Sequence, residues 1–228
     1  INMKKLILLF STLALLLSPA IANASGLAVG VTVSSNTLDT AGKEDVDSNG
    51  TIDATKNVSD DITIGSIFAE FTGMGDRFGI TLGVDYIPFD ADIDKRSITQ
   101  SSLKGSGTTA TSGTNSVEAS VSDHYTVYIQ PGLMIGSNTM LYGTFGWASA
   151  TINGKSTSLS HTDINKDQDL DGTKIGVGIK KVYDSGLFVK ADYAETEYDT
   201  ISFTTSNSTK ATADLDNAAF ALSVGKQF

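Results

Sequence analysis

Two acidic strings carry the residue types that bind hard metal ions. Oxygen-bearing groups recur at every second position from Asp45 to Asp53, and again from Asp167 to Asp171. Carboxylate and carbonyl oxygens are the ligands that Ca²⁺ takes in proteins. The sequence therefore predicts weak calcium sites. The expected side-chain ligands are Asp45, Asp47, Asn49, Asp53, Asp167, Asp169 and Asp171, and the carbonyl of Thr51 would add one more.

The first acidic string resembles the first nine positions of an EF-hand calcium loop, with Gly50 at the sharp turn of that loop. Lys56 occupies the twelfth position, where the EF-hand has a bidentate glutamate, so an isolated site would be weak and incomplete. In the alternative interpretation, no cofactor binds and both strings are solvated loops, with Asn49 and Gly50 forming a hairpin turn.

Histidine-based catalysis has two candidates, because His124 and His161 are the only histidines. Ser122, Asp123 and His124 are adjacent, but neighbours on a strand point to opposite faces, so adjacency does not make a triad. The string from His124 to Thr126 is similar to the His-x-Ser arrangement of outer-membrane lipid A deacylases, but it has threonine in place of serine. We expect no catalytic residues and no enzyme activity. A lipid-modifying outer-membrane enzyme is the alternative.

The elements that must position these residues are β-strands. Apolar residues recur at every second position, which is the period of a strand with one apolar face. The chain therefore predicts an all-β protein of about eight strands. The clear runs are 27–34, 78–86, 174–180, 187–193 and 218–228, and the less regular ones are 62–71, 125–135 and 141–151.

Short and long connections alternate between these runs. Short turns on one side and long loops on the other, joining an even number of strands, are typical of outer-membrane barrels, whose long loops are extracellular. We predict a closed antiparallel transmembrane β-barrel of about eight strands. A soluble β-sandwich is less consistent with the many glycines and charges on the polar face. The short links are near 73–76, 137–139 and 184–186, and the long loops are predicted near 37–60, 89–122, 153–171 and 196–216.

The N-terminal segment has the pattern of a secretory signal peptide. Lys4 and Lys5 precede a nearly unbroken apolar run from Leu6 to Leu17, and a small-residue cleavage pattern ends at Ala24. The run is shorter than the roughly 20 residues that a membrane-spanning helix needs. We predict that residues 1–24 are a signal peptide with upstream residues, and that residues 25–228 form the barrel.

Composition excludes several classes of function. The chain has 228 residues, no cysteine and a formal net charge of -10. The negative charge repels phosphate, which argues against a nucleic-acid partner. The absence of cysteine excludes disulfides, thiolate metal sites and cysteine nucleophiles.

The last nine residues, Phe220 to Phe228, form an apolar alternation that ends in phenylalanine. This stretch resembles the C-terminal signal that outer-membrane barrels present to their assembly machinery. Nearly the whole mature chain resembles the OmpA- and OmpX-type eight-stranded barrels. The resemblance implies the outer membrane of a Gram-negative bacterium, contact with membrane lipid and lipopolysaccharide, and recognition of the Phe228 strand by the assembly machinery. We expect a monomer without the periplasmic domain of full-length OmpA.

The polar faces of the predicted strands carry charges of both signs. Inside a narrow barrel such charges need partners, so we expect ion pairs that fill the lumen. Water-filled channels belong to wider barrels of about 16 strands. We predict a non-enzymatic barrel with a structural or surface-interaction role through acidic extracellular loops, and a narrow channel for small solutes is the alternative. The expected inward residues are Glu70, Arg77, Asp85, Lys174, Lys180, Lys190 and Asp192.

Overall fold

The computed structural model describes residues 26–45, 49–103, 111–157, 164–204 and 210–228. The predicted signal peptide lies outside the described residues. Within these ranges the regular structure consists of strands, and no helix is long and apolar enough to cross a membrane. The strands are β1 (Gly26–Asp45), β2 (Ala54–Met74), β3 (Phe78–Tyr86), β4 (Ala91–Leu103), β5 (Thr111–Met134), β6 (Thr139–Thr157), β7 (Ile164–Val182), β8 (Leu187–Tyr198), β9 (Ile201–Thr204) and β10 (Lys210–Gln227).

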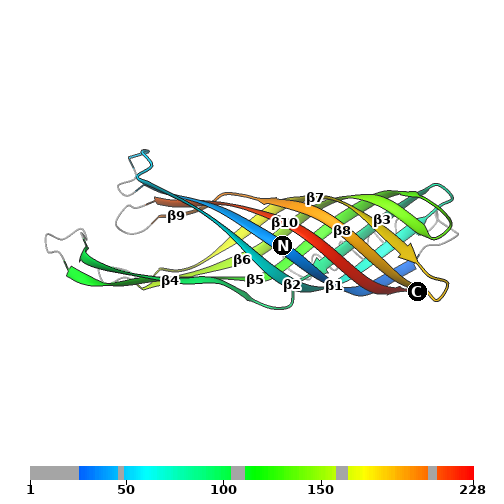
Figure 1. Cartoon of the computed structure of the whole chain (residues 1–228), viewed down its shortest axis with the longest axis horizontal. Helices are drawn as coiled ribbons and strands as arrows, with labels where there is room; N and C mark the ends of the chain where they lie inside the picture. The colour runs from blue at the N-terminus through cyan, green and yellow to red at the C-terminus, as the bar shows by residue number, and fades with distance from the viewer. Residues whose placement is uncertain (1–25, 46–48, 104–110, 158–163, 205–209) are drawn as a thin grey trace.

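Eight of these strands close into an antiparallel ring. Their order is β1-β2-β3-β5-β6-β7-β8-β10, and β10 pairs back onto β1 from Ala28↔Gln227 to Asp45↔Lys210. Closure gives every ring strand two neighbours, so backbone hydrogen bonds are satisfied without water. The predicted all-β fold and eight-stranded closed barrel are confirmed. β4 and β9 lie outside the ring and extend the ribbons at one end of the molecule, where they pair with β5 and β10 (Figure 1).

The strands continue far into the segments that the sequence predicts as long loops. β1 and β2 stay paired as far as Glu44↔Ala54, inside the range 37–60. β4, β9 and the outer parts of β5, β6, β7 and β10 likewise occupy much of the other three ranges. The alternation rule misses these parts because a ribbon with water on both faces has no apolar side. The connections are therefore shorter, and the strands longer, than the sequence predicts.

The other end of the barrel has tight turns at the three predicted short links. Gly75 N donates to Phe78 O at 2.8 Å, Ile135 N donates to Thr139 O at 2.9 Å, and Gly186 N donates to Tyr183 O at 2.7 Å. Gly186 has a φ of 77°, a left-handed conformation that favours glycine. The C-terminus lies at this end (Figure 1).

The two faces of the ring strands have opposite character. Large apolar side chains point outward in successive strands, and we call them the apolar belt. At the edge nearer the ribbons, the rings of Tyr125 and Trp147 meet edge to face with centroids 5.7 Å apart. A water-soluble barrel would have the reverse arrangement. The belt comprises Leu27, Val29, Val31, Val33, Ile67, Phe78, Tyr86, Ile129, Leu133, Leu141, Phe145, Ile175, Val177, Ile179, Leu187, Val189, Tyr193, Phe220, Leu222 and Val224, all exposed.

Beyond the belt, on the ribbon side, the interior becomes apolar. Ala150, Ile152, Leu170 and Ile201 form a buried cluster, against which Val121, Tyr198 and Leu215 pack. We call these seven residues the upper cluster. Outward positions on the same strands, such as Asp169 and Asp216, are charged and exposed. The polarity of the barrel wall is therefore reversed between the belt and the ribbons.

Candidate functional site in the barrel lumen

Three charged side chains meet in the lumen at the level of the belt. Glu70 on β2 faces inward because it alternates with the outward-facing Ile67, Ala69 and Phe71 and shares its face with the buried Phe68 and Thr72. Lys180 Nζ lies 2.5 Å from Glu70 Oε1, and Lys190 Nζ lies 3.1 Å from Glu70 Oε2. The side chains of Glu70 and Lys180 are fully buried, and that of Lys190 is nearly so. The predicted luminal ion pairs are confirmed for these three residues.

Neutral polar groups complete the coordination of these charges. Tyr128 OH donates to Glu70 Oε2 at 3.2 Å, and Lys180 Nζ donates to Thr72 Oγ1 at 3.1 Å. Lys190 Nζ also donates to Gln130 Oε1 at 3.3 Å. A buried ion pair needs additional hydrogen bonds to be stable, and each of these three charged groups has a neutral hydrogen-bond partner.

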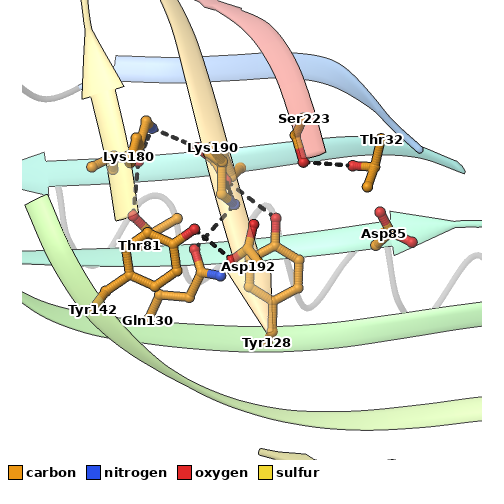
Figure 2. Close-up of polar contacts among 12 residues, drawn as sticks. Thr32, Thr81, Asp85, Tyr128, Gln130, Tyr142, Lys180, Lys190, Asp192 and Ser223 are labelled. Carbon is orange, nitrogen blue, oxygen red and sulfur yellow. Dashed lines mark hydrogen bonds and ion pairs between the residues drawn. The ribbon is translucent and has the colours of Figure 1, made fainter. Parts of the chain in front are cut away.

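A second pair of hydrogen bonds extends this arrangement across the barrel. Tyr142 OH donates to Asp192 Oδ1 at 2.5 Å, and Gln130 Nε2 donates to Thr144 Oγ1 at 3.1 Å. Figure 2 shows Tyr128, Gln130 and Tyr142 reaching toward Lys180 and Lys190 from the facing strands. We call the connected residues the lumen network. The Tyr142 ring, 5.5 Å from the Lys190 ammonium, links the Asp192 pair to the rest, and Thr81 shares a hydrogen bond with Thr72. The members are Glu70, Thr72, Thr81, Tyr128, Gln130, Tyr142, Thr144, Lys180, Lys190 and Asp192.

Aromatic rings fill the remaining space toward the short-turn end. The Lys180 ammonium lies 4.2 Å from the centroid of the Phe188 ring, and the Lys190 ammonium lies 5.2 Å from that of Phe68. Gly30 makes this packing possible, because a Cβ there would overlap the Phe68 ring. Small luminal residues thus leave room for large ones on facing strands.

The lumen network spans the centre of the barrel. It joins β2 to β5, β6, β7 and β8, and an eight-stranded barrel leaves an interior just wide enough for side chains. Asp85 also faces inward and accepts a hydrogen bond from Ser66 Oγ at 2.7 Å. The predicted luminal position of Arg77 is wrong. Arg77 lies exposed in the turn between β2 and β3, because β3 begins one residue later, at Phe78.

The barrel has charged side chains inside, an apolar outer surface and no unpaired edge strand. This arrangement is stable in lipid and unfavourable in water. The chain is a membrane-spanning β-barrel. A single-chain antiparallel barrel with an apolar belt and a polar interior is the architecture of outer-membrane proteins, and the outer membrane is its location. In outer-membrane barrels the short turns face the periplasm and the longer connections lie outside the cell, and we propose the same orientation for this chain.

Solved outer-membrane proteins have similar folds at low sequence identity. The attachment invasion locus protein Ail of Yersinia pestis, solved in complex with the heparin analogue sucrose octasulfate, is 12% identical over 86% of this chain and 99% of its own, with a TM-score of 0.37. OprG of Pseudomonas aeruginosa is 16% identical over 91% and 99%, with a TM-score of 0.45. The outer membrane protease OmpT of Escherichia coli is 10% identical over 89% and 97%, with a TM-score of 0.49.

No protein-family model matches the chain, and the search of curated proteins finds no similar sequence. Likeness at such identities concerns the fold. The assignments that follow therefore depend on the geometry of this chain.

The residues of the first predicted calcium site lie at the tip of β1. Asp45 accepts hydrogen bonds from Asn49 N at 3.1 Å and from Gly50 N at 2.8 Å. Asn49 Oδ1 accepts one from Thr51 N at 2.8 Å. Gly50 has a φ of 90°, as a sharp turn requires. Asp47 lies outside the described residues, so the geometry of the complete site is not defined.

The residues of the second predicted site lie on a strand. Asp167, Asp169 and Asp171 occupy alternate positions of β7 and point outward. In the part of the chain that the structure describes, no group of three or more His, Cys, Asp or Glu side chains could hold a metal ion. Calcium binding stays a prediction at both acidic strings.

His124 faces the barrel interior and not a catalytic partner. His124 Nε2 lies 2.8 Å from Tyr198 OH, and Ser122 Oγ accepts a hydrogen bond from Asn153 Nδ2 at 2.9 Å. Among the described side chains, no hydrogen bond joins Ser122, Asp123 and His124 to one another. Tyr198 itself lies inside the barrel, as part of the upper cluster.

Proposed function

We propose that this protein is a non-enzymatic, non-conducting outer-membrane barrel that acts through the acidic surface of its extracellular strands. The observation that supports it most strongly is the lumen network. Glu70, Lys180 and Lys190 are buried at the centre of the barrel and bonded to one another, so they oppose passage of solute. A barrel with its interior filled offers its outer surfaces for function.

The acidic surface lies immediately beyond the belt. Asp39 on β1 is directly opposite Asp216 on β10, and Asp216 is directly opposite Glu197 on β8. All three are exposed and point outward. Like charges at directly opposed positions destabilise a sheet, so folding alone does not favour this row. Its negative potential would attract cationic molecules to the cell surface and repel anionic ones.

The proposed partners follow from the position of these surfaces. The belt contacts membrane lipid, and lipopolysaccharide would surround the outer leaflet. Phe228 is exposed at the end of the chain, where its N donates to Leu27 O at 2.9 Å, and the assembly machinery would recognise this strand. The ring closes within one chain, which supports a monomer.

A surface-binding assay tests this proposal on intact cells. Cells displaying the wild-type barrel are expected to bind more of a fluorescent cationic peptide than cells displaying the triple variant D39N/D216N/E197Q. The matched control is D76N/D184N, which removes two exposed carboxylates from the periplasmic turns. It should bind as the wild type does. Equal binding by the triple variant and the wild type would refute the surface role.

Two further assays separate the alternatives. A lipid-modifying enzyme would alter lipid A when the barrel is produced, and His124→Gln would abolish the change. A narrow channel would give discrete conductance steps in a planar bilayer. The proposed function predicts neither result. Sucrose octasulfate, the heparin analogue bound to Ail, is expected not to bind the acidic surface of this barrel.

A further inference from the structure

A layer of inward-facing polar side chains lies between the lumen network and the upper cluster. Lys174 on β7 is directly opposite Thr196 on β8, and Thr196 is directly opposite Asn217 on β10. Asn217 Nδ2 donates to Asn36 Oδ1 on β1 at 3.1 Å. His124 enters the same level from β5, where its Nε2 lies 2.8 Å from Tyr198 OH. Tyr198 is directly opposite Gly172, the inward-facing position next to Lys174 on β7. The polar layer comprises the five residues Lys174, Thr196, Asn217, Asn36 and His124.

Three groups in the polar layer have unmet hydrogen-bonding capacity. His124 Nδ1 and Asn217 Oδ1 are buried atoms without a hydrogen-bond partner. The Lys174 ammonium forms no hydrogen bond or salt bridge with any side chain that the structure describes. Buried polar groups are nearly always satisfied, so these two buried atoms are expected to have a partner. Lys174 is partly buried, and its ammonium brings a positive charge to the same layer. The polar layer therefore has hydrogen-bonding groups that could bind a ligand.

The backbone is strained where it brings His124 into this layer. Between the pairs Ser122↔Thr151 and Tyr125↔Ser149, β5 has two residues and β6 has one, which is a β-bulge. Asp123, the first residue of the bulge, has a φ of 53°, which is uncommon outside glycine. Such strain persists where the surrounding structure requires it, often at binding sites. Here it directs His124 into the interior.

The charges of the layer indicate the chemistry of its ligand. Lys174 carries the one formal charge among the five residues. Asp85, an inward-facing carboxylate of β3, already accepts a hydrogen bond from Ser66 at 2.7 Å. If Tyr198 OH donates to His124 Nε2, then His124 Nδ1 carries the proton and is a donor. An ammonium, an imidazole N–H and the Thr196 hydroxyl are all donors suited to an anion.

We propose that the polar layer binds a small inorganic anion of the halide class, held by Lys174 Nζ and His124 Nδ1. The anion accepts hydrogen bonds from both groups and from Thr196. In the occupied site, the Lys174 ammonium also donates a hydrogen bond to Asn217 Oδ1, which is an acceptor. The lumen network on one side and the upper cluster on the other limit the site to a small ion. The site is independent of the surface role proposed above.

Bromide is the direct probe, because it replaces chloride and scatters X-rays anomalously. Crystals of the full folded barrel in detergent, grown with bromide as the only halide, are expected to contain one anomalous peak inside the barrel. It should lie within hydrogen-bonding distance of Lys174 Nζ and His124 Nδ1. Lys174→Met should abolish the peak. Lys181→Met, which removes an exposed lysine from the same strand, should retain it. Water at this position in the wild type, without anomalous signal, would overturn the proposal.

Thermal unfolding in solution gives a second measurement. A ligand that binds only the folded state raises the unfolding temperature with increasing concentration. When chloride replaces gluconate at constant ionic strength, the wild type and Lys181→Met should show a rise in unfolding temperature that saturates. Lys174→Met and His124→Phe should show none. Equal rises in the wild type and Lys174→Met would contradict the proposal. If Lys174→Met does not fold, the wild-type bromide experiment decides the question.

Discussion

Two regions of the barrel wall have the same strand geometry but opposite polarity. At the belt, apolar side chains face outward and polar ones face inward, whereas closer to the ribbons the apolar side chains face inward. At the belt, Val177 faces outward and Lys180 faces inward. Eight residues closer to the ribbons on β7, Asp169 faces outward, and its neighbour Leu170 faces inward. The difference shows that the surrounding solvent, and not the strand, decides which face is apolar. It also marks where the membrane ends.

The largest effect is expected from breaking the lumen network on one side. Glu70→Ala leaves two buried ammonium groups without their carboxylate, and removing one partner of a buried ion pair destabilises by about 3–5 kcal/mol. Urea unfolding of the barrel refolded in lipid vesicles measures this loss. The variant E70L/K180M/K190M removes all three charges and should recover much of the stability. If Glu70→Ala unfolds like the wild type, the network does not support the lumen.

The interior beyond the belt should respond as an ordinary apolar core. Leu170 is buried in the upper cluster, and Leu170→Ala is expected to destabilise by about 2–5 kcal/mol, the range for buried leucine truncation. Asp169→Ala, at the exposed neighbouring position, is the control and should change little. The same urea experiment compares them. Equal effects at the two positions would contradict the reversal of polarity along β7.

Lysine substitutions on the outer face of β7 test where the barrel contacts lipid. Val177 points outward near the middle of the belt, and Val177→Lys is expected to cost about 2–4 kcal/mol, as a lysine does at the bilayer midplane. Thr173→Lys, four residues closer to the ribbons, should cost about 0–1 kcal/mol, as near an interface. Unfolding from lipid vesicles measures both. Similar costs at both positions would indicate that the belt is not in contact with lipid.

The exposed ion pair of the ribbons should contribute least. Lys43 Nζ lies 3.3 Å from Asp214 Oδ2, with both side chains largely exposed. The hydrogen bond from Thr200, followed by that from Lys43, lowers the pKa of Asp214 below its usual value. Any stabilisation is therefore present at neutral pH and disappears as the pH falls through this lowered value. Exposed pairs contribute little, so Asp214→Asn should not measurably change unfolding at pH 7.

The effect of calcium on stability should differ between variants at the two ends of the barrel. If the first acidic string binds the ion, millimolar calcium should raise the unfolding temperature slightly, and chelator should reverse the rise. Asp53→Asn should abolish it, whereas Asp76→Asn in a periplasmic turn should not. No calcium dependence in the wild type would exclude the metal sites while leaving the barrel unaffected.

The fold could be predicted because the alternation of apolar residues in the sequence identifies the strands that form the belt. In β3, Ile80, Leu82 and Val84 all face outward, so the period alone assigns both faces and places Asp85 inside. Tyr128 and Gln130 could have been found by the same rule, since they alternate with Val127 and Ile129. The extent of the strands beyond the belt could not, because the outer end of β2 is exposed on both faces and has no apolar side.

The polar layer could not be predicted from the sequence. The bulge at Asp123 shifts the alternation of β5, and nothing in the string from Ser122 to Tyr125 indicates a left-handed residue there. The contact between His124 and Tyr198 joins positions that are 74 residues apart, and it depends on the stagger of all strands between them. The partners of Glu70 could not be predicted for the same reason, since they also depend on the stagger of the strands. Alternation predicts that charges face inward, but only the register of the closed ring decides which of them meet.

Single-channel recording tests the closed lumen most directly. The purified barrel, inserted in a planar lipid bilayer, is expected to give no discrete conductance steps, because Glu70, Lys180 and Lys190 join opposite walls at its centre. The triple variant E70A/K180A/K190A, which opens that space, should produce steps if it folds. Stable, repeated steps from the wild-type protein would contradict the account.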